Sequence, residues 1–321
     1  MMFQCTRLLG LLSLSIITHV AIGLRIGAFN IQVFGRSKMG KPEVVSVLVD
    51  ILSRYDIVLV QEIRDNSGEV ITELVAYLAA SGNKFQFAVS SRLGRTSSKE
   101  QYAFLYRPEM GISLMDEYVF DDGNETLNTA NVSMDLFERE PYVVMFKSTK
   151  TRLATFVLAG IHVSPSKAVE EINHLADVFA DIRRKWTIND IMVLGDLNAG
   201  CSYVSQKDWD RIPLKHDPAY AWLLPDDTDT TVGGTHCAYD RFVMTGYNFR
   251  REYLNDSAIA FRFDDAYGLH HTFALEVSDH YPIELQLKDR VTSSGLTIVT
   301  LPSGYDIIFL MFSYTRMYME I

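Results

Sequence analysis

Residues 191–201 read IMVLGDLNAGC, a strand-like run that leads directly into a turn. The apolar residues at its start, with the β-branched Ile191 and Val193 among them, are typical of a strand that is buried on both faces. Asp196 and Asn198 follow two residues apart, so both can point the same way and offer hard oxygen ligands to a cation such as Mg²⁺. The alternative is an Asx-type turn that only caps the strand, and this stretch alone does not exclude it.

Other strand-like runs of the chain also carry polar residues at one end. These residues are Asn30, Glu62, His162, Asp240 and the pair Asp279–His280. Their recurrence favours a functional site over a simple turn. If these strand ends gather at one edge of stacked sheets, oxygen donors and two imidazoles share one site.

Strands and helices alternate along the chain. The apolar periodicity predicts strands over residues 24–31 and 56–62 and helices over residues 42–54, 69–80 and 166–186. Further strands are predicted over residues 85–90, 102–107, 142–147, 152–162, 236–243 and 278–287, and a short helix over residues 217–224. Charged residues of the longest helix, Glu171 among them, are assigned to its solvated face. No repeat or linker divides residues 24–290, so we expect one α/β domain.

The two ends of the chain differ from this domain. Residues 1–23 have the pattern of a secretory signal peptide, with Arg7 ahead of an apolar run over residues 8–20. A membrane anchor is the alternative, but the run is shorter than the roughly 20 residues that a span needs. Residues 291–321 hold a short apolar patch, and we expect a disordered tail there. A lipid-anchor signal is the alternative for this tail, but charged residues interrupt its pattern.

Composition adds three expectations for a secreted chain. The formal net charge of −10 becomes −11 when Arg7 is removed with the signal peptide, so the protein is not attracted globally to a polyanion. Cys201 and Cys237 then form an even pair, and in an oxidising compartment a disulfide between them would stabilise the fold by roughly 4 kcal/mol. Sequons for N-glycosylation begin at Asn124, Asn131 and Asn255.

Two loops could bind charged ligands. Residues 91–100 form a Gly/Ser-rich loop with several basic residues, which fits a phosphate backbone and equally a solvated surface loop. Residues 226–231 form an acidic loop that lacks the Gly and the distal Glu of an EF-hand, so a plain loop is favoured over a Ca²⁺ site.

The strand-end residues contain the parts that phosphodiester hydrolysis needs. A divalent metal neutralises the phosphate, a base takes a proton from water, and an acid protonates the leaving oxygen. His162 and His280 fit the last two roles best when a carboxylate orients each imidazole, as Glu100 and Asp240 could.

Seven motifs resemble the deoxyribonuclease I family, in order and over residues 24–288. They are AFNIQ at residues 28–32, VQEIRD at 60–65, LGR and KE within 93–100, REP at 139–141, GDLNAGC at 195–201, THCAYDR at 235–241 and SDHYP at 278–282. Motifs that agree in this order are far more specific together than any one of them alone.

This resemblance implies a four-layer α/β/β/α sandwich of the deoxyribonuclease I or endonuclease-exonuclease-phosphatase type. It implies a secreted endonuclease that cuts double-stranded DNA with Mg²⁺ and is helped by structural Ca²⁺, and we expect a monomer without a stable membrane span. By matching position, His162 paired with Glu100 and His280 paired with Asp240 are the implied acid and base. The implied metal and phosphate ligands are Glu62, Asp196, Asn198, Asn30 and Asp279, the implied DNA contacts are Arg64, Arg95 and Arg139, and the implied disulfide joins Cys201 to Cys237.

The sequence also departs from the family pattern. Ser98 stands where the family has a tyrosine that contacts the minor groove, and the surface by which deoxyribonuclease I binds actin differs here around Ser67 and Phe87. Actin is therefore only a candidate partner. A phosphatase or a sphingomyelinase-like phosphodiesterase on the same fold is one alternative function, and a non-catalytic DNA- or actin-binding relative is another.

Overall fold

The computed structural model describes residues 22–123 and 135–290. The predicted tail, the predicted signal peptide up to residue 21 and the sequons at Asn124 and Asn131 lie outside these residues. The third sequon residue, Asn255, is exposed in a turn.

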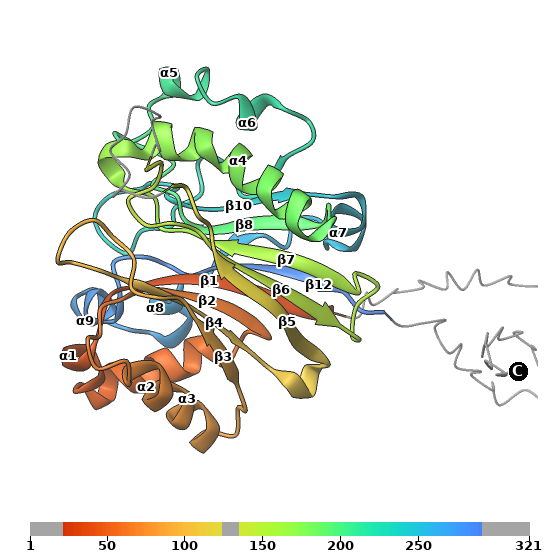
Figure 1. Cartoon of the computed structure of the whole chain (residues 1–321). Coiled ribbons are helices and arrows are strands. Elements are labelled where there is room, and N and C mark those ends of the chain that lie inside the picture. The colour runs from red at the N-terminus through yellow and green to blue at the C-terminus, as the bar shows by residue number, and fades with distance from the viewer. Residues whose placement is uncertain (1–21, 124–134, 291–321) are drawn as a thin grey trace, which may run out of the picture.

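Two mixed sheets form the centre of the molecule (Figure 1). The first has the strand order β11 (Ile259–Ala260), β12 (Ile283–Lys288), β1 (Ile22–Phe34), β2 (Ile57–Ile63), β4 (Gln101–Tyr106) and β3 (Gln86–Val89). The second has the order β5 (Ile112–Val119), β6 (Tyr142–Ser148), β7 (Thr155–Gly160), β8 (Ile191–Asp196), β10 (Asp240–Thr245) and β9 (Ala221–Trp222). The pairs β1–β2 and β7–β8 are parallel, and the other pairs are antiparallel.

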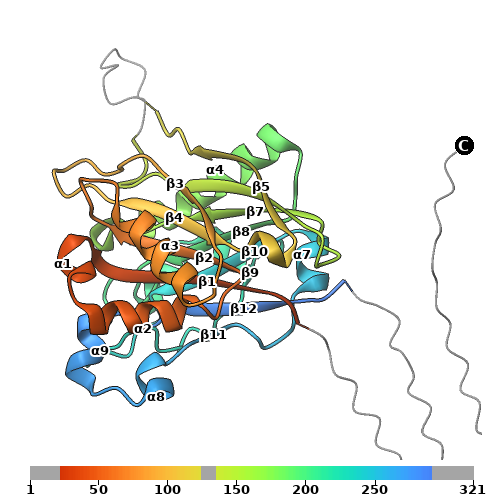
Figure 2. The same cartoon turned by 90° about the horizontal axis from the view of Figure 1, so that it is seen from below.

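Helices cover the outer face of each sheet. The first sheet carries α1 (Arg36–Met39), α2 (Pro42–Leu52), α3 (Val70–Ala80), α8 (Phe263–Tyr267) and α9 (His271–Val277), and Figure 2 shows this side of the molecule. The second sheet carries α4 (Ala168–Trp186), α5 (Gln206–Trp209) and α6 (Pro213–His216). The helix α7 (Tyr247–Glu252) follows β10, and short 3₁₀ turns lie at Pro108–Met110 and Pro165–Lys167.

Alternation along the strands produces three apolar layers. In β8, Met192 and Leu194 belong to the core between the sheets, whereas Ile191 and Val193 belong to the core beneath α4. Successive side chains of a strand point to opposite faces, so a strand with helices on one side and a sheet on the other is apolar throughout. The predicted four-layer α/β/β/α sandwich is confirmed.

Two glycines allow the sheets to approach each other at one end of the sandwich. A Cβ atom on Gly160 would lie 2.7 Å from Leu59 Cδ1 in the opposite sheet. Gly195 has a φ of +127°, and a Cβ atom there would lie 2.8 Å from Gln61 Nε2 in the opposite sheet and 2.5 Å from the Ile161 carbonyl oxygen in its own sheet. Larger residues at these positions would force the strand ends apart.

Most of the predicted elements are confirmed with small changes in their bounds, but two expectations are wrong. Residues 217–224 do not form a helix; they form a turn that leads into β9, because Pro218 disfavours helical geometry at Asp217, whose ψ is 118°. Glu171 does not face solvent, since it is 2% exposed. Its carboxylate accepts hydrogen bonds from the backbone N–H groups of Glu138 (3.2 Å) and Ser164 (3.1 Å).

Candidate active site

The sheet topology brings the polar strand ends to one edge of the sandwich. The parallel pairs β1–β2 and β7–β8 place Asn30, Glu62, His162 and Asp196 near or just beyond the carboxyl ends of their strands. β10 runs antiparallel to β8, so its first residue, Asp240, pairs directly with Asp196. The start of β10 therefore lies at the same edge of the sandwich as the carboxyl ends of β1, β2, β7 and β8.

Asp196 lies at the centre of this group. Its Oδ2 atom is 3.2 Å from Asn30 Nδ2, 3.4 Å from His162 Nε2 and 3.6 Å from His280 Nε2. The two imidazoles, which are 118 positions apart in the sequence, therefore direct the same ring atom to one carboxylate oxygen. Asp196 is 1% exposed.

A buried carboxylate supports the first imidazole. Glu100 Oε2 is 2.9 Å from His162 Nδ1, and Glu100 Oε1 is 2.7 Å from Arg64 Nη2 and 3.5 Å from Arg139 Nη1. Burial raises the pKa of Glu100, but the hydrogen bond and charge of His162, with the charges of the two arginines, outweigh burial and lower the pKa to about 2. Glu100 is therefore ionised at neutral pH and holds the Nδ1 side of His162.

The second imidazole has the same kind of support. Asp240 Oδ2 is 2.8 Å from His280 Nδ1, and Asp240 is fully buried. Burial lowers the pKa of His280, but the charges of Asp240 and Asp196 outweigh it and raise the pKa to about 10. The Ser278 hydroxyl accepts a hydrogen bond from the His280 backbone N–H (3.0 Å), which fixes the segment that carries the ring.

Strained backbone holds the other two strand-end residues. Asn30 Nδ2 donates to Glu62 Oε1 (3.1 Å), and the Val33 backbone N–H donates to Glu62 Oε2 (2.8 Å). Gln32, Val33 and Glu62 have φ values of 45°, 51° and 56°, a left-handed region that is rare for residues other than glycine. Such strain concentrates at functional sites, where the surrounding structure compensates for it.

Asp196 and Asn198 form the Asx-type turn that was the alternative interpretation of this stretch of sequence. Its backbone N–H donates to Asp196 Oδ1 (2.9 Å), and its side-chain amide donates to the Val163 carbonyl (2.9 Å). The Asx turn therefore exists, but it uses Oδ1 and leaves Asp196 Oδ2 directed at the two histidines. Asp279 Oδ1 lies at the edge of the group, 4.0 Å from His280 Nε2.

Of the three predicted DNA-contacting arginines, two lie against this group. Arg64 bridges Glu100 and Glu62, the latter at 3.3 Å, and Arg139 Nε donates to the His162 carbonyl (3.1 Å). Arg95 binds elsewhere: its guanidinium contacts the Asp135 carboxylate (2.5 Å) and the Phe137 carbonyl (3.0 Å).

The basic loop is partly neutralised by its neighbours. Arg92, Arg95 and Lys99 line a polar cavity of about 360 Å³, which acidic side chains also line. These acidic residues are Asp121, Asp135, Glu138 and Glu140. The loop is therefore not a purely basic surface, and its charge is balanced locally.

The donor set fits a divalent cation. Asp196, Asp240 and His280 each offer a ligand atom, and these atoms lie within 4.8 Å of one another. Among residues 22–123 and 135–290, no group forms a hydrogen bond with the buried Asp240 Oδ1 atom, and a buried oxygen is costly unless another group contacts it. Glu62 adds carboxylate oxygens nearby, and hard oxygen ligands are those that Mg²⁺ and Ca²⁺ prefer. Asn30 turns its Nδ2 atom to Glu62 and Asp196, and its Oδ1 atom accepts from the Gln32 backbone N–H (2.9 Å).

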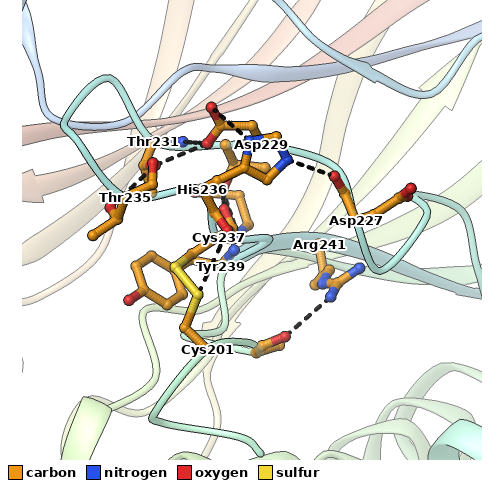
Figure 3. Close-up of a disulfide and its surroundings, with 12 residues drawn as sticks. Cys201, Asp227, Asp229, Thr231, Thr235, His236, Cys237, Tyr239 and Arg241 are labelled. Atoms are coloured by element: carbon orange, nitrogen blue, oxygen red, sulfur yellow. Dashed lines mark hydrogen bonds and ion pairs between the residues drawn. A yellow bond between two sulfur atoms is a disulfide. The ribbon is translucent and has the colours of Figure 1, made fainter. Parts of the chain in front are cut away.

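The predicted disulfide between Cys201 and Cys237 is present (Figure 3). It ties the loop that follows Asp196 to the segment that leads into Asp240, with a Cα–Cα distance of 5.7 Å. Arg241 reinforces this junction, since its Nη2 donates to the Ala199 carbonyl (3.0 Å).

Sequence reasoning missed three polar residues at the site, of which Tyr102 and Gln61 are buried. The Tyr102 hydroxyl accepts a hydrogen bond from the His162 backbone N–H (2.8 Å), and Lys38 Nζ donates to the carbonyls of Ile31 (2.6 Å) and Val277 (2.7 Å). The Gln61 amide contacts residues of the opposite sheet. The sequence could have indicated a role for Gln61, because it is a polar residue inside an otherwise apolar strand. The sequence around Lys38 and Tyr102 has no comparable feature.

The fold and this site define a class of protein. The Endonuclease/Exonuclease/phosphatase family model matches residues 27–280. Solved structures agree on the fold: a conserved protein of unknown function from Enterococcus faecalis has a TM-score of 0.55 at 15% identity, covering 83% of this chain and 100% of that one. The human Nocturnin catalytic domain has a TM-score of 0.54 at 14% identity, covering 83% and 94%.

Curated relatives narrow the class. Deoxyribonuclease-1 of Sus scrofa is 44% identical over 287 residues, which cover 89% of this chain and 99% of that protein. Deoxyribonuclease-1 of Homo sapiens is 45% identical over 284 residues, which cover 88% and 99%. This chain belongs to the deoxyribonuclease I family. Among the helices that the structure describes, none has the length and apolar character needed to cross a bilayer.

Proposed function

We propose that this protein is an endonuclease that hydrolyses phosphodiester bonds of DNA with the help of a divalent cation. One observation carries the proposal: two imidazoles, each backed by a buried carboxylate, direct Nε2 at the same Asp196 oxygen. Hydrolysis needs a proton acceptor for water and a proton donor for the leaving oxygen, and two rings facing one point supply both.

In this proposal, His162 with Glu100 and His280 with Asp240 form the acid–base pair. Each carboxylate holds Nδ1, so each ring keeps a fixed orientation and exchanges protons through Nε2. His162 receives further support from Tyr102 and Arg139, which bind its backbone N–H and carbonyl.

The cation in this proposal is Mg²⁺, held by Glu62, Asp196, Asn198, Asn30 and Asp279. Of the group formed by Asp196, Asp240 and His280, only Asp196 is a metal ligand in this proposal, because Asp240 and His280 form an acid–base pair. When bound, it would neutralise the phosphate and the charge that develops there during hydrolysis. Structural Ca²⁺ is proposed from the family resemblance alone.

Arg64 and Arg139 are the proposed DNA contacts at the site, because both lie next to Glu100, which supports the imidazole of His162. Arg95 is kept as a third, more distant contact. A net charge of −11 for the chain without its signal peptide means that these local cations and the metal must attract the backbone.

We further propose a secreted, glycosylated monomer with a signal peptide over residues 1–23, a nuclease domain over residues 24–290 and a tail beyond it.

Actin is a hypothetical partner, and co-sedimentation of the purified protein with actin tests this. The absence of co-sedimentation would remove actin from the account.

The experiment that tests the proposed activity compares three phosphate esters. Purified protein is incubated with supercoiled plasmid, sphingomyelin vesicles and an inositol phosphate in the presence of Mg²⁺. We expect nicking of the plasmid. Cleavage of sphingomyelin or release of inorganic phosphate without nicking would favour the related phosphodiesterases and phosphatases, and DNA binding without cleavage would favour a non-catalytic relative.

A further inference from the structure

Gln61 places a buried amide on a strand face that is otherwise apolar. Ile57 and Leu59 precede it on β2 at two-residue spacing and belong to the core between the sheets. Alternation places the Gln61 side chain on that same face. The residue is 0% exposed, and a buried amide is costly unless it is hydrogen-bonded.

The Gln61 amide is inserted into the ladder between β7 and β8 of the opposite sheet. Ile161 N–H donates to the Leu194 carbonyl (3.1 Å), and further along Val163 N–H donates to the Asp196 carbonyl (2.9 Å). In a regular parallel ladder, Asp196 N–H would donate to the Ile161 carbonyl between these two bonds. Within residues 22–123 and 135–290 that direct bond is missing. Asp196 N–H donates instead to Gln61 Oε1 (3.1 Å), and Gln61 Nε2 donates to the Ile161 carbonyl (2.8 Å).

Gly195 provides the space for this insertion. A Cβ atom at Gly195 would lie 2.5 Å from the Ile161 oxygen and 2.8 Å from Gln61 Nε2. The glycine of one sheet and the glutamine of the other are therefore complementary. The Gln61 amide forms hydrogen bonds with the Asp196 N–H and the Ile161 carbonyl, which would otherwise have no partner where β7 and β8 separate.

We propose that Gln61 is a positioning residue that fixes the register between the two halves of the catalytic site. Glu62 directly follows Gln61 on β2, His162 directly follows Ile161, and Asp196 is itself bonded to the amide. One side chain thus links the strand end that carries Glu62 to the two that carry His162 and Asp196. This inference deepens the proposed function and rests on it.

The test compares Gln61→Met with Leu59→Met. Both substitutions place methionine on the same face of β2, but only Gln61→Met removes the inserted amide. We expect kcat for plasmid cleavage to fall about 100-fold in Gln61→Met, the order expected when reacting groups shift by about 1 Å. KM and DNA affinity should stay within about 3-fold of the wild type, and Leu59→Met should keep the wild-type kcat. Equal kcat values in the two variants, or a change in KM alone, would overturn the proposal.

A second readout does not depend on activity. Hydrogen exchange at the Asp196 amide should be faster in Gln61→Met than in Leu59→Met, because the amide loses its acceptor. Unchanged protection would mean that direct pairing of β7 and β8 replaces the insertion, and the proposal would be wrong. If the wild type does not cut DNA, the proposed function fails while this exchange measurement still decides whether the insertion exists. If Gln61→Met does not fold, Gln61→Asn replaces it with the same expected loss in kcat, because an amide shorter by one methylene cannot reach both the Asp196 N–H and the Ile161 carbonyl.

Discussion

Replacing Glu100 with glutamine removes one negative charge from the site and nearly preserves the shape of the side chain. Glu100 is 1% exposed and contacts His162, Arg64 and Arg139. These contacts lower its pKa from the usual 4.5 to about 2, and each pKa unit corresponds to about 1.4 kcal/mol. The ionised carboxylate therefore contributes about 3 kcal/mol to the free energy of unfolding at neutral pH.

The sign of this contribution sets its pH dependence. The pKa of Glu100 is lower in the folded state than in the unfolded chain, so the contribution is complete above pH 4.5 and is lost as the pH falls towards 2. We expect Glu100→Gln to be less stable than the wild type by about 3 kcal/mol at pH 7 and by only about 1 kcal/mol at pH 3. Urea unfolding at both pH values measures the two differences.

The same substitution should slow catalysis. Glutamine cannot hold His162 as a carboxylate does, so kcat for DNA cleavage should fall about 100-fold, within the range usual for loss of acid–base function. Glu170→Gln is the matched control, because Glu170 is an exposed carboxylate that pairs with Lys167, and its loss should change stability by less than about 0.5 kcal/mol. A Glu100→Gln protein with wild-type kcat, or with a stability deficit that does not shrink at low pH, would refute the reasoning.

Three further predictions concern the imidazole, the disulfide and the arginines. His162→Ala should retain its fold and DNA affinity but cut at least about 100-fold more slowly in a plasmid assay; near-normal cleavage would remove His162 from the mechanism. Cys201→Ser with Cys237→Ser should lower the free energy of unfolding by roughly 4 kcal/mol in urea titrations, since the bond closes a loop with a sequence separation of 36, and unchanged stability would contradict this. Arg139→Ala should reduce kcat by about 10-fold or more and Arg95→Ala by less, because Arg139, unlike Arg95, contacts Glu100 and the His162 carbonyl; the reverse order in parallel assays would be evidence against this assignment.

Periodicity predicted an α/β fold, and strand-end chemistry predicted most of the residues that meet at its edge. The four-layer α/β/β/α arrangement was implied only by the resemblance to the deoxyribonuclease I family. The apolar residues 191–194 lie in β8 with both faces covered, and the polar residue that follows, Asp196, lies at the centre of the site. The prediction succeeded because the carboxyl ends of parallel strands lie at the same edge of a sheet. A polar residue that follows each buried strand therefore lies at that edge.

Long-range partners and marginal elements were harder to predict. Glu171 was assigned to solvent because helix periodicity does not show that two neighbouring loops fold over its carboxylate. Arg95 carried the same charge as Arg139, but local sequence does not show that Asp135 binds it. The edge strand β5 and the short helices α7, α8 and α9 were not predicted, because segments this short or this exposed have weak periodicity.

The central claim is that residues from distant parts of the chain converge on Asp196 to cut a phosphodiester bond of DNA with a metal ion. Conversion of supercoiled plasmid to the open circular form, followed with Mg²⁺ present and with excess EDTA, tests it most directly. The account predicts rapid nicking with Mg²⁺ and none in EDTA. Nicking that persists in EDTA, or no nicking under either condition, would contradict it.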